Sequence, residues 1–275
     1  MLPDIFNLIH CLKKLIHFQI RRNSMPFFEY DGLKVFYRIE GSGKPLLLLH
    51  GNTVSSEMFS QDITFFSKNR LVIAIDSPGF GKSDRLSPLR DDFWYYNSQV
   101  ALSLCQSLKL SQIDIIGTSG GSTVALNLAI QKPDLVDYII ADSSPGNCLT
   151  QNEVSAIKTG REHSKKTPMA DYWKNIHGAD WERVIDLDTA MLERVAENNL
   201  PLLIGDLSVI SGPVLFTGSL RDEAISHIEE KFSKLALQIK KSLVLLFPNG
   251  YHPFLISRNK EFRQIAMKFL NDDLF

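Results

Sequence analysis

The chain has few cysteines, and their placement argues against both a disulfide framework and a zinc site. Its 275 residues contain three, Cys11, Cys105 and Cys148. Their number is odd, they lie far apart, and no two form the CxxC pair of zinc sites and redox motifs. A reducing, cytoplasmic setting is therefore the expectation.

An excess of charge of one sign is also absent. Lys and Arg number 30 against 31 Asp and Glu, a formal net charge of -1. Nucleic acids and anionic membranes are bound by strongly basic surfaces, so neither is expected as a partner. No run approaches the roughly 18 apolar residues of a membrane span, which argues against stable membrane insertion. A small-molecule substrate fits this composition, and the oligomeric state is left open.

Residues 1–24 differ from the rest of the chain. Apolar side chains recur there at helical spacing, at Ile5, Ile9, Leu12, Leu15 and Ile16, and Lys13, Lys14, Arg21 and Arg22 make the stretch basic. We interpret it as an N-terminal extension, with an amphipathic helix lying on a membrane or a partner as the alternative. It lacks the charged start, apolar stretch and small-residue cleavage site of a secretory signal.

From Met25 onward, short β-rich runs alternate with helix-like stretches. The predicted strands are residues 26–30, 33–40, 45–50, 71–76, 113–117, 138–143, 213–218 and 242–250. Several are continuous aliphatic runs, as strands buried on both faces require. The pattern predicts an α/β fold with a mostly parallel, doubly wound, eight-stranded sheet. The turn at Asp31-Gly32 predicts that the first two strands pair antiparallel.

Apolar residues at helical spacing predict the helices between these strands. They cover residues 57–66, 98–107, 121–131, 223–238 and 259–270. Between residues 144 and 200 no strand is predicted, and a polar, helical segment with scattered aromatic residues takes over. We therefore predict a helical cap at 144–200, inserted into a core formed by residues 25–143 and 201–275.

The sequence Gly117-Thr118-Ser119-Gly120-Gly121 lies directly between a predicted strand and a predicted helix. A strand-to-helix turn this tight strains its central residue, and flanking glycines remove the Cβ atoms that would collide. The helix that follows directs its free N–H groups and positive dipole end at Ser119. This placement indicates a serine nucleophile. A chance glycine-rich turn is the alternative; a phosphate-binding loop would need a Lys-Ser/Thr ending, which is absent.

A serine hydroxyl needs a base to accept its proton, and His252 is the best candidate among seven histidines. It lies in a loop between the last predicted strand and the last predicted helix, at the expected sheet edge. His163, His177 and His227 fall in helical stretches that we expect to be solvated. His50 ends a strand and is expected to bond the backbone.

The third group must orient the imidazole, which calls for a carboxylate at another strand end. Asp222, just past the strand at 213–218, fits best. The resulting chain order of Ser, Asp and His is that of the α/β hydrolases. Asp142, at the end of the strand at 138–143, and Glu223 are alternatives.

Together these residues resemble the α/β-hydrolase-fold family, and its serine esterases in particular, over almost all of the chain from Met25. Besides the GTSGG turn, the chain carries LLLLHGN at 46–52 and IDSPGFGKSD at 75–84, in the family's order. The resemblance implies an oxyanion hole formed by the main-chain N–H groups of Asn52 and Gly120. Two spacings depart from the family: Asp222 lies four residues after Gly218 rather than three, and Tyr251 separates His252 from the preceding glycine.

The expected function is hydrolysis of a small carboxylic ester, lactone or thioester through an acyl-enzyme, with no metal or organic cofactor. HGNTVSS at 50–56 is also similar to haloalkane dehalogenases, but those enzymes need an aspartate where this chain has Ser119. A carbon–carbon bond hydrolase and a cofactor-free, peroxidase-like enzyme of the same fold are alternatives. A non-catalytic ligand sensor on this fold is an alternative of another class.

Overall fold

The computed structural model describes residues 26–274, so the predicted N-terminal extension at 1–24 lies outside the described residues. Within the described part of the chain, no helix combines the length and the apolar character needed to cross a membrane.

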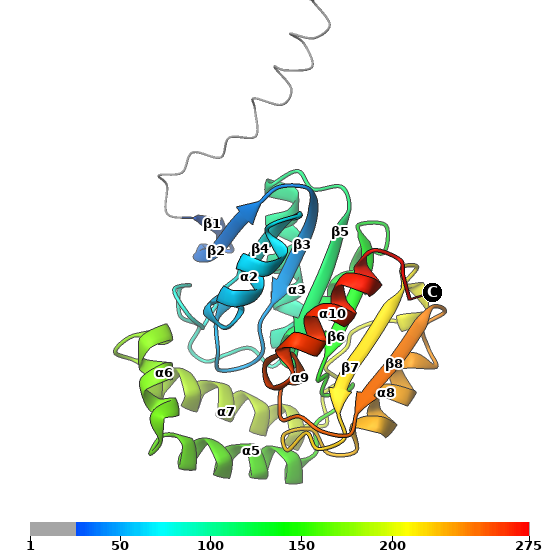
Figure 1. Ribbon diagram of the computed structural model, residues 1–275. Helices are drawn as coiled ribbons and strands as arrows, with labels where there is room; N and C mark the ends of the chain where they lie inside the picture. Colours follow the sequence, from blue (N-terminus) through cyan, green and yellow to red (C-terminus); the bar gives the residue numbers. More distant parts are fainter. Residues whose placement is uncertain (1–25, 275) are drawn as a thin grey trace, which may run out of the picture.

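One eight-stranded sheet runs through the molecule (Figure 1). The strands are β1 (Phe27–Tyr30), β2 (Leu33–Gly41), β3 (Lys44–Leu49), β4 (Arg70–Ile75), β5 (Ile113–Thr118), β6 (Val136–Asp142), β7 (Val214–Ser219) and β8 (Ser242–Phe247). Their order in the sheet is β1-β2-β4-β3-β5-β6-β7-β8. As predicted, β1 and β2 pair antiparallel; β2 also runs antiparallel to β4, and all later pairs are parallel. The predicted fold class and all eight predicted strands are confirmed.

The central strands are apolar on both faces because helices cover both. In β3, Leu47 and Leu49 pack into one hydrophobic cluster, and Leu46 and Leu48 pack into another on the opposite face. Successive side chains of a strand point to opposite faces. An uninterrupted leucine run is therefore what a strand between two helical layers needs.

The two helical layers contain α3 (Phe93–Ser107), α4 (Gly120–Gln131) and α8 (Ile228–Ala236) on one face, and α2 (Ser60–Phe66), α9 (Phe254–Ser257) and α10 (Asn259–Leu270) on the other. A 3₁₀ turn at Ser56–Phe59 precedes α2. The α10 prediction is confirmed residue for residue. The helix predicted at 223–238 begins only at Ile228, because the Asp222 carboxylate accepts the N–H groups of Ala224 and Ile225 and holds them in a turn.

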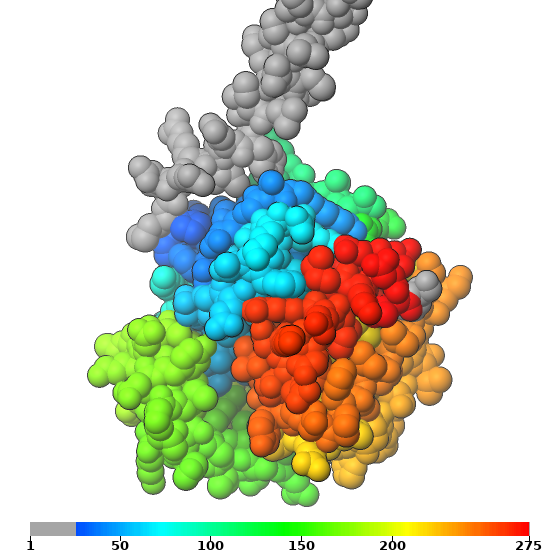
Figure 2. Space-filling model, viewed as in Figure 1, coloured from blue at the N-terminus to red at the C-terminus, as the bar shows by residue number. Residues whose placement is uncertain are grey.

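Three helices lie between β6 and β7: α5 (Gln151–Ser164), α6 (Pro168–His177) and α7 (Trp181–Glu197). These helices cross one end of the sheet (Figure 1), and their green atoms form part of the molecular surface at that end (Figure 2). The start of α5 carries a capping box: Thr150 and Glu153 satisfy each other's backbone N–H groups. Pro168 occupies the first turn of α6, where its missing N–H costs nothing.

A buried ionic cluster lies at the opposite end of the sheet from these three helices. The fully buried carboxylate of Asp114, near the start of β5, pairs with Arg70 and with Lys44. Arg70 also donates to the carbonyl oxygen of Leu270, at 2.8 Å, which fixes the end of α10. Burial raises the pKa of Asp114, although both cations oppose the shift.

We expect Arg70→Met to lower the free energy of unfolding by about 3 kcal/mol, because the buried Asp114 carboxylate loses the more buried of its two cations and keeps only the partly exposed Lys44. Urea unfolding of wild type and variant measures the difference. Arg90→Met, which removes an exposed ion pair with Asp92, is the matched control and should cost less than about 1 kcal/mol. If Arg70→Met loses no more free energy of unfolding than Arg90→Met, the expectation is contradicted.

Candidate active site

Ser119 occupies the tight turn between β5 and α4. Its backbone has φ 54° and ψ -126°, a strained conformation for a residue with a side chain. The turn is possible because its neighbours lack side chains: a Cβ on Gly117 would lie 2.3 Å from the carbonyl oxygen of Gly121, and one on Gly121 would lie 2.1 Å from that of Leu49. The sequence thus places the Ser119 hydroxyl at the sheet edge through local backbone geometry.

His252 and Asp222 converge on Ser119 from two other strand ends. Nε2 of His252 lies 2.9 Å from Oγ of Ser119, and Nδ1 lies 3.0 and 2.9 Å from Oδ1 and Oδ2 of Asp222. The Asp222 side chain is fully buried, and that of His252 is 17% exposed. When Nδ1–H of His252 donates to the Asp222 carboxylate, Nε2 carries no hydrogen and can accept the proton of the Ser119 hydroxyl. The two departures from the family's spacing do not keep these three side chains apart.

The two alternative carboxylates have other partners. Asp142 is fully buried and accepts the hydroxyls of Thr118 and Thr217, at 2.9 and 2.8 Å, and the N–H of Leu255, at 3.1 Å. Burial raises the pKa of Asp142 to about 6 despite these donors. Glu223 accepts the main-chain N–H of His252 at 3.0 Å. Neither carboxylate bonds the imidazole, which Asp222 does.

Asn52 and Gly120 lie together beside the serine. Asn52 follows β3, and Gly120 is the first residue of α4, where a helix N–H has no intrahelical acceptor. A Cβ on Gly120 would lie 2.0 Å from Oδ1 of Asn52, so the two residues are in direct contact. Gly51 is equally close to Ser119, because a Cβ on Gly51 would lie 2.9 Å from the Cβ of Ser119. This contact brings the loop after β3 against the Ser119 turn.

His50 bonds backbone groups, as predicted. Its Nδ1 lies 2.7 Å from the carbonyl oxygen of Gly51, and its Nε2 accepts the N–H of Ser77 at 2.9 Å. Burial lowers the pKa of His50, so the ring is held neutral. It joins the loops after β3 and β4.

The prediction that His177 lies on a solvated face is wrong. His177 ends α6, is only 4% exposed and packs against Phe80. Its Nδ1 accepts the N–H of Gly81 at 2.9 Å, and its Nε2 lies 3.0 Å from the carbonyl oxygen of Thr53. Helical periodicity alone did not reveal this burial, because the face of α6 that carries His177 packs on loops distant in sequence.

His177 should make the protein less stable in mild acid. Burial lowers the pKa of His177 to about 4, whereas the unfolded chain protonates near 6.5. The unfolded state therefore binds more protons between these values, and the free energy of unfolding falls as pH drops from 6.5 to 4, by up to about 3 kcal/mol. His177→Gln should remove this contribution, and urea unfolding of both proteins at pH 7.5 and 4.5 measures it.

The difference between the two proteins isolates His177 from other groups that titrate in the same range. Asp142, whose pKa is raised, acts in the opposite direction and is common to both. An equal loss of stability in wild type and variant would contradict the expectation.

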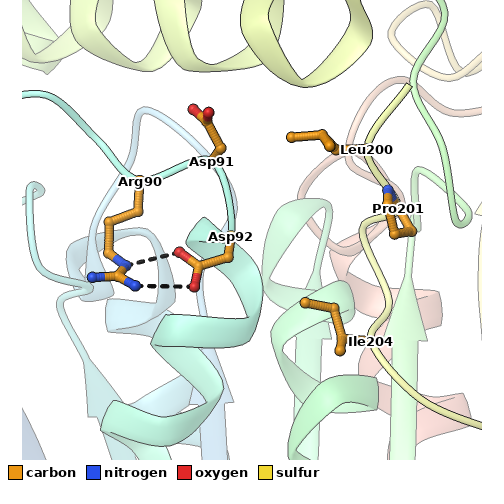
Figure 3. A pocket seen from close by; sticks show the side chains of 6 residues that line it. All are labelled: Arg90, Asp91, Asp92, Leu200, Pro201 and Ile204. Carbon is orange, nitrogen blue, oxygen red and sulfur yellow. Dashed lines mark hydrogen bonds and ion pairs between the residues drawn. The ribbon is translucent and has the colours of Figure 1, made fainter. Parts of the chain in front are cut away.

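A surface pocket of about 390 Å³ lies between the start of α3 and the segment that follows α7 (Figure 3). It is lined by Arg90, Asp91, Asp92, Leu200, Pro201 and Ile204. Figure 3 shows the polar residues on one side, with Arg90 paired to Asp92 through two hydrogen bonds, and the apolar residues on the other. None of the predicted site residues lines it.

Sequence reasoning missed a polar residue of α7 that reaches the site. Asp188 is fully buried, and its Oδ1 accepts the side-chain amide of Asn52 at 2.6 Å. Asp188 lies on the buried stripe of α7, between Ile185 and Met191. An acidic residue on an otherwise apolar helix face was the signal that could have found it.

The comparisons with known proteins agree with the fold. Residues 44–160 match the family model described as the alpha/beta hydrolase fold. The chain has the α/β-hydrolase fold. The matched residues include Asn52, Ser119 and Asp142, and the sheet around them has the eight strands and two helical layers described above.

Two curated hydrolases match part of the chain. An (E)-2-((N-methylformamido)methylene)succinate hydrolase from Acinetobacter baylyi is 33% identical over 36% of this chain and 37% of its own. A 2-hydroxymuconate semialdehyde hydrolase from a Pseudomonas species is 30% identical over 42% of this chain and 41% of its own. The match therefore spans less than half the length of either relative.

Solved structures extend the likeness to nearly the whole chain. An esterase from Exiguobacterium antarcticum superimposes with a TM-score of 0.70 over 90% of this chain and 100% of its own, at 19% identity. At that identity the likeness shows the fold alone.

Proposed function

We propose that the protein hydrolyses a small carboxylic ester, lactone or thioester through a Ser-His-Asp acyl-enzyme mechanism. The observation that carries the proposal is the hydrogen-bonded series from Ser119 through His252 to Asp222. Each residue follows a different strand, β5, β8 or β7, so the series depends on the whole sheet. The names of the relatives, both hydrolases, support a hydrolytic reaction.

In the proposed mechanism, Ser119 Oγ attacks the carbonyl carbon while Nε2 of His252 accepts its proton. Asp222 stabilises the imidazolium that forms and holds the ring in the required tautomer. The negative charge on the carbonyl oxygen is met by the main-chain N–H groups of Asn52 and Gly120. His252 gives this proton to the leaving oxygen or sulfur as its bond to the acyl carbon breaks, so an alcohol or thiol departs, or a lactone opens with its hydroxyl still attached to the acyl group. Water then attacks the acyl-enzyme as His252 takes its proton, and His252 returns that proton to Ser119 Oγ as the carboxylic acid leaves.

Helices α5, α6 and α7 would act as a cap over this site. They lie across the end of the sheet, and Asp188 and His177 contact the loop that holds Asn52. The side chains of such a segment would enclose the acyl group. The proposal therefore assigns substrate selection to residues 144–200.

A direct test combines turnover with covalent labelling. Purified protein is assayed with p-nitrophenyl esters of increasing acyl length, with lactones and with thioesters, and is separately treated with a fluorophosphonate. We expect turnover of at least one ester class and one phosphonyl group per chain, located on Ser119 by peptide mass. Labelling without turnover of any substrate would favour the ligand sensor. Absence of both would contradict the proposed function.

A further inference from the structure

Two side chains of helices α5–α7, Asp188 and His177, contact the loop that follows β3. Oδ1 of Asp188, on α7, accepts a hydrogen bond from Nδ2 of Asn52 at 2.6 Å. Nε2 of His177, at the end of α6, lies 3.0 Å from the carbonyl oxygen of the next residue, Thr53, and can donate to it. Other polar contacts of the segment, such as Arg194 with Asp91, reach different loops. The loop at 52–53 is thus held from two helices.

Asp188 belongs to a buried ion pair. Its Oδ2 accepts from Nη2 of Arg161, on α5, at 2.6 Å, and Nη1 of Arg161 donates to Thr189 at 2.8 Å. The side chains of Arg161 and Asp188 are 11% and 0% exposed. Such pairs contribute little net stability, because the desolvation of both charges offsets their attraction. Apolar residues would fill the same space, but they would offer no acceptor to the Asn52 amide.

The loop that Asp188 holds has a conformation that needs external support. Thr53 has φ 60°, a left-handed conformation that is unfavourable for a β-branched residue. Oδ1 of Asn52 accepts from Nε1 of Trp94 at 3.4 Å and lies against Gly120, where a Cβ would approach it to 2.0 Å. Backbone strain of this kind persists only where surrounding contacts over-determine the conformation. Asp188, His177, Trp94 and Gly120 supply those contacts.

We propose that Asp188 is a positioning residue for the oxyanion hole. Arg161 fixes the Asp188 carboxylate, which accepts the side-chain amide of Asn52 and so keeps the main-chain N–H of Asn52 directed at the oxyanion. The inference rests on the proposed function, because it assumes that Asn52 stabilises that charge. If Asp188 has this role, the rate of the chemical step depends on how helices α5–α7 pack on the core. Loss of the contact would lower kcat much more than it changes KM, because the oxyanion exists only in the transition state and intermediate.

The test uses two double variants that differ in one property. R161M/D188N keeps an acceptor for the Asn52 amide, and R161M/D188L removes it; neither leaves Arg161 buried without its carboxylate. We expect R161M/D188N to retain kcat within about threefold of wild type. R161M/D188L should lose about 10- to 100-fold in kcat with KM nearly unchanged, since a displaced donor costs this much. D186A is the control: Asp186 lies on α7 and pairs only with Lys165 among the described residues.

The same pair of substitutions is then placed in an N52A background. There the difference between R161M/D188N and R161M/D188L should vanish, because the residue through which Asp188 acts is gone. A difference that persists would overturn the proposal, as would equal kcat values of the two double variants with Asn52 present. N52A alone must lower kcat, and an unchanged kcat would overturn the proposal even if the double variants do not fold.

Ser119→Ala separates this inference from the proposed function. If Ser119→Ala and wild type hydrolyse the substrate at the same rate, the proposed function fails. If Ser119→Ala is inactive while the two double variants are equally active, only the role of Asp188 fails.

Discussion

Replacement of Ser119 by alanine is expected to lower the rate of ester hydrolysis by about 10³-fold or more. The Ser119 hydroxyl lies 2.9 Å from Nε2 of His252, and alanine offers this nitrogen no hydroxyl. Without this hydroxyl the proposed acyl-enzyme cannot form. Steady-state kinetics with the best ester found for wild type measures the loss.

The Ser119→Ala protein should fold normally. Alanine has the same Cβ as serine, so the backbone at φ 54° carries no additional strain. Ser122→Ala is the matched control, because its hydroxyl lies in the same turn and donates to the carbonyl oxygen of Ser119 at 2.6 Å. It should retain activity within about tenfold. Comparable turnover by Ser119→Ala and wild type would contradict the serine mechanism.

Asp222→Asn should lower kcat by about 10⁴-fold while leaving the geometry of the site intact. Oδ1 of Asp222 accepts the N–H groups of Ala224 and Ile225 at 3.0 and 2.9 Å, and an asparagine oxygen can do the same. The amide NH₂ would then face Nδ1 of His252, where Oδ2 now lies at 2.9 Å. That donor favours the tautomer with hydrogen on Nε2, which cannot accept the serine proton.

Asp142→Asn is the informative comparison for the acid. Asp142 is bonded to Thr118, Thr217 and the N–H of Leu255 and not to the imidazole. Its amide variant should therefore keep kcat within about tenfold, and its main effect should be a lower melting temperature from the mismatched donors. A large loss in Asp142→Asn together with a small loss in Asp222→Asn would reverse the assignment of the acid.

Much of the fold was predictable because its signals are local. The leucine run at 46–49 and the aliphatic strands beside it specify strands covered on both faces, wherever the chain later places them. The boundary of α8 was not predictable in this way. Its start depends on Asp222, whose side chain accepts two N–H groups and delays the helix to Ile228.

The candidate site, like the fold, has parts that the sequence predicts and parts that it does not. The sequence by itself determined the turn that presents Ser119, because the glycines around it act within a few residues along the chain. It narrowed the base to His252 but left three carboxylates, Asp222, Asp142 and Glu223, as partners. Periodicity and spacing describe neighbours along the chain and do not describe distances between separate strand ends.

Only the tertiary structure decided which of these side chains meet. His252 lies 133 positions from Ser119 and bonds Asp222, while Asp142, nearer the serine in sequence, faces two threonines. Asp188 reaches Asn52 across 136 positions, a contact that no local pattern contains. Such contacts exist because the sheet gathers the ends of parallel strands at one edge and α5–α7 pack over that edge, and this proximity is a property of the folded chain.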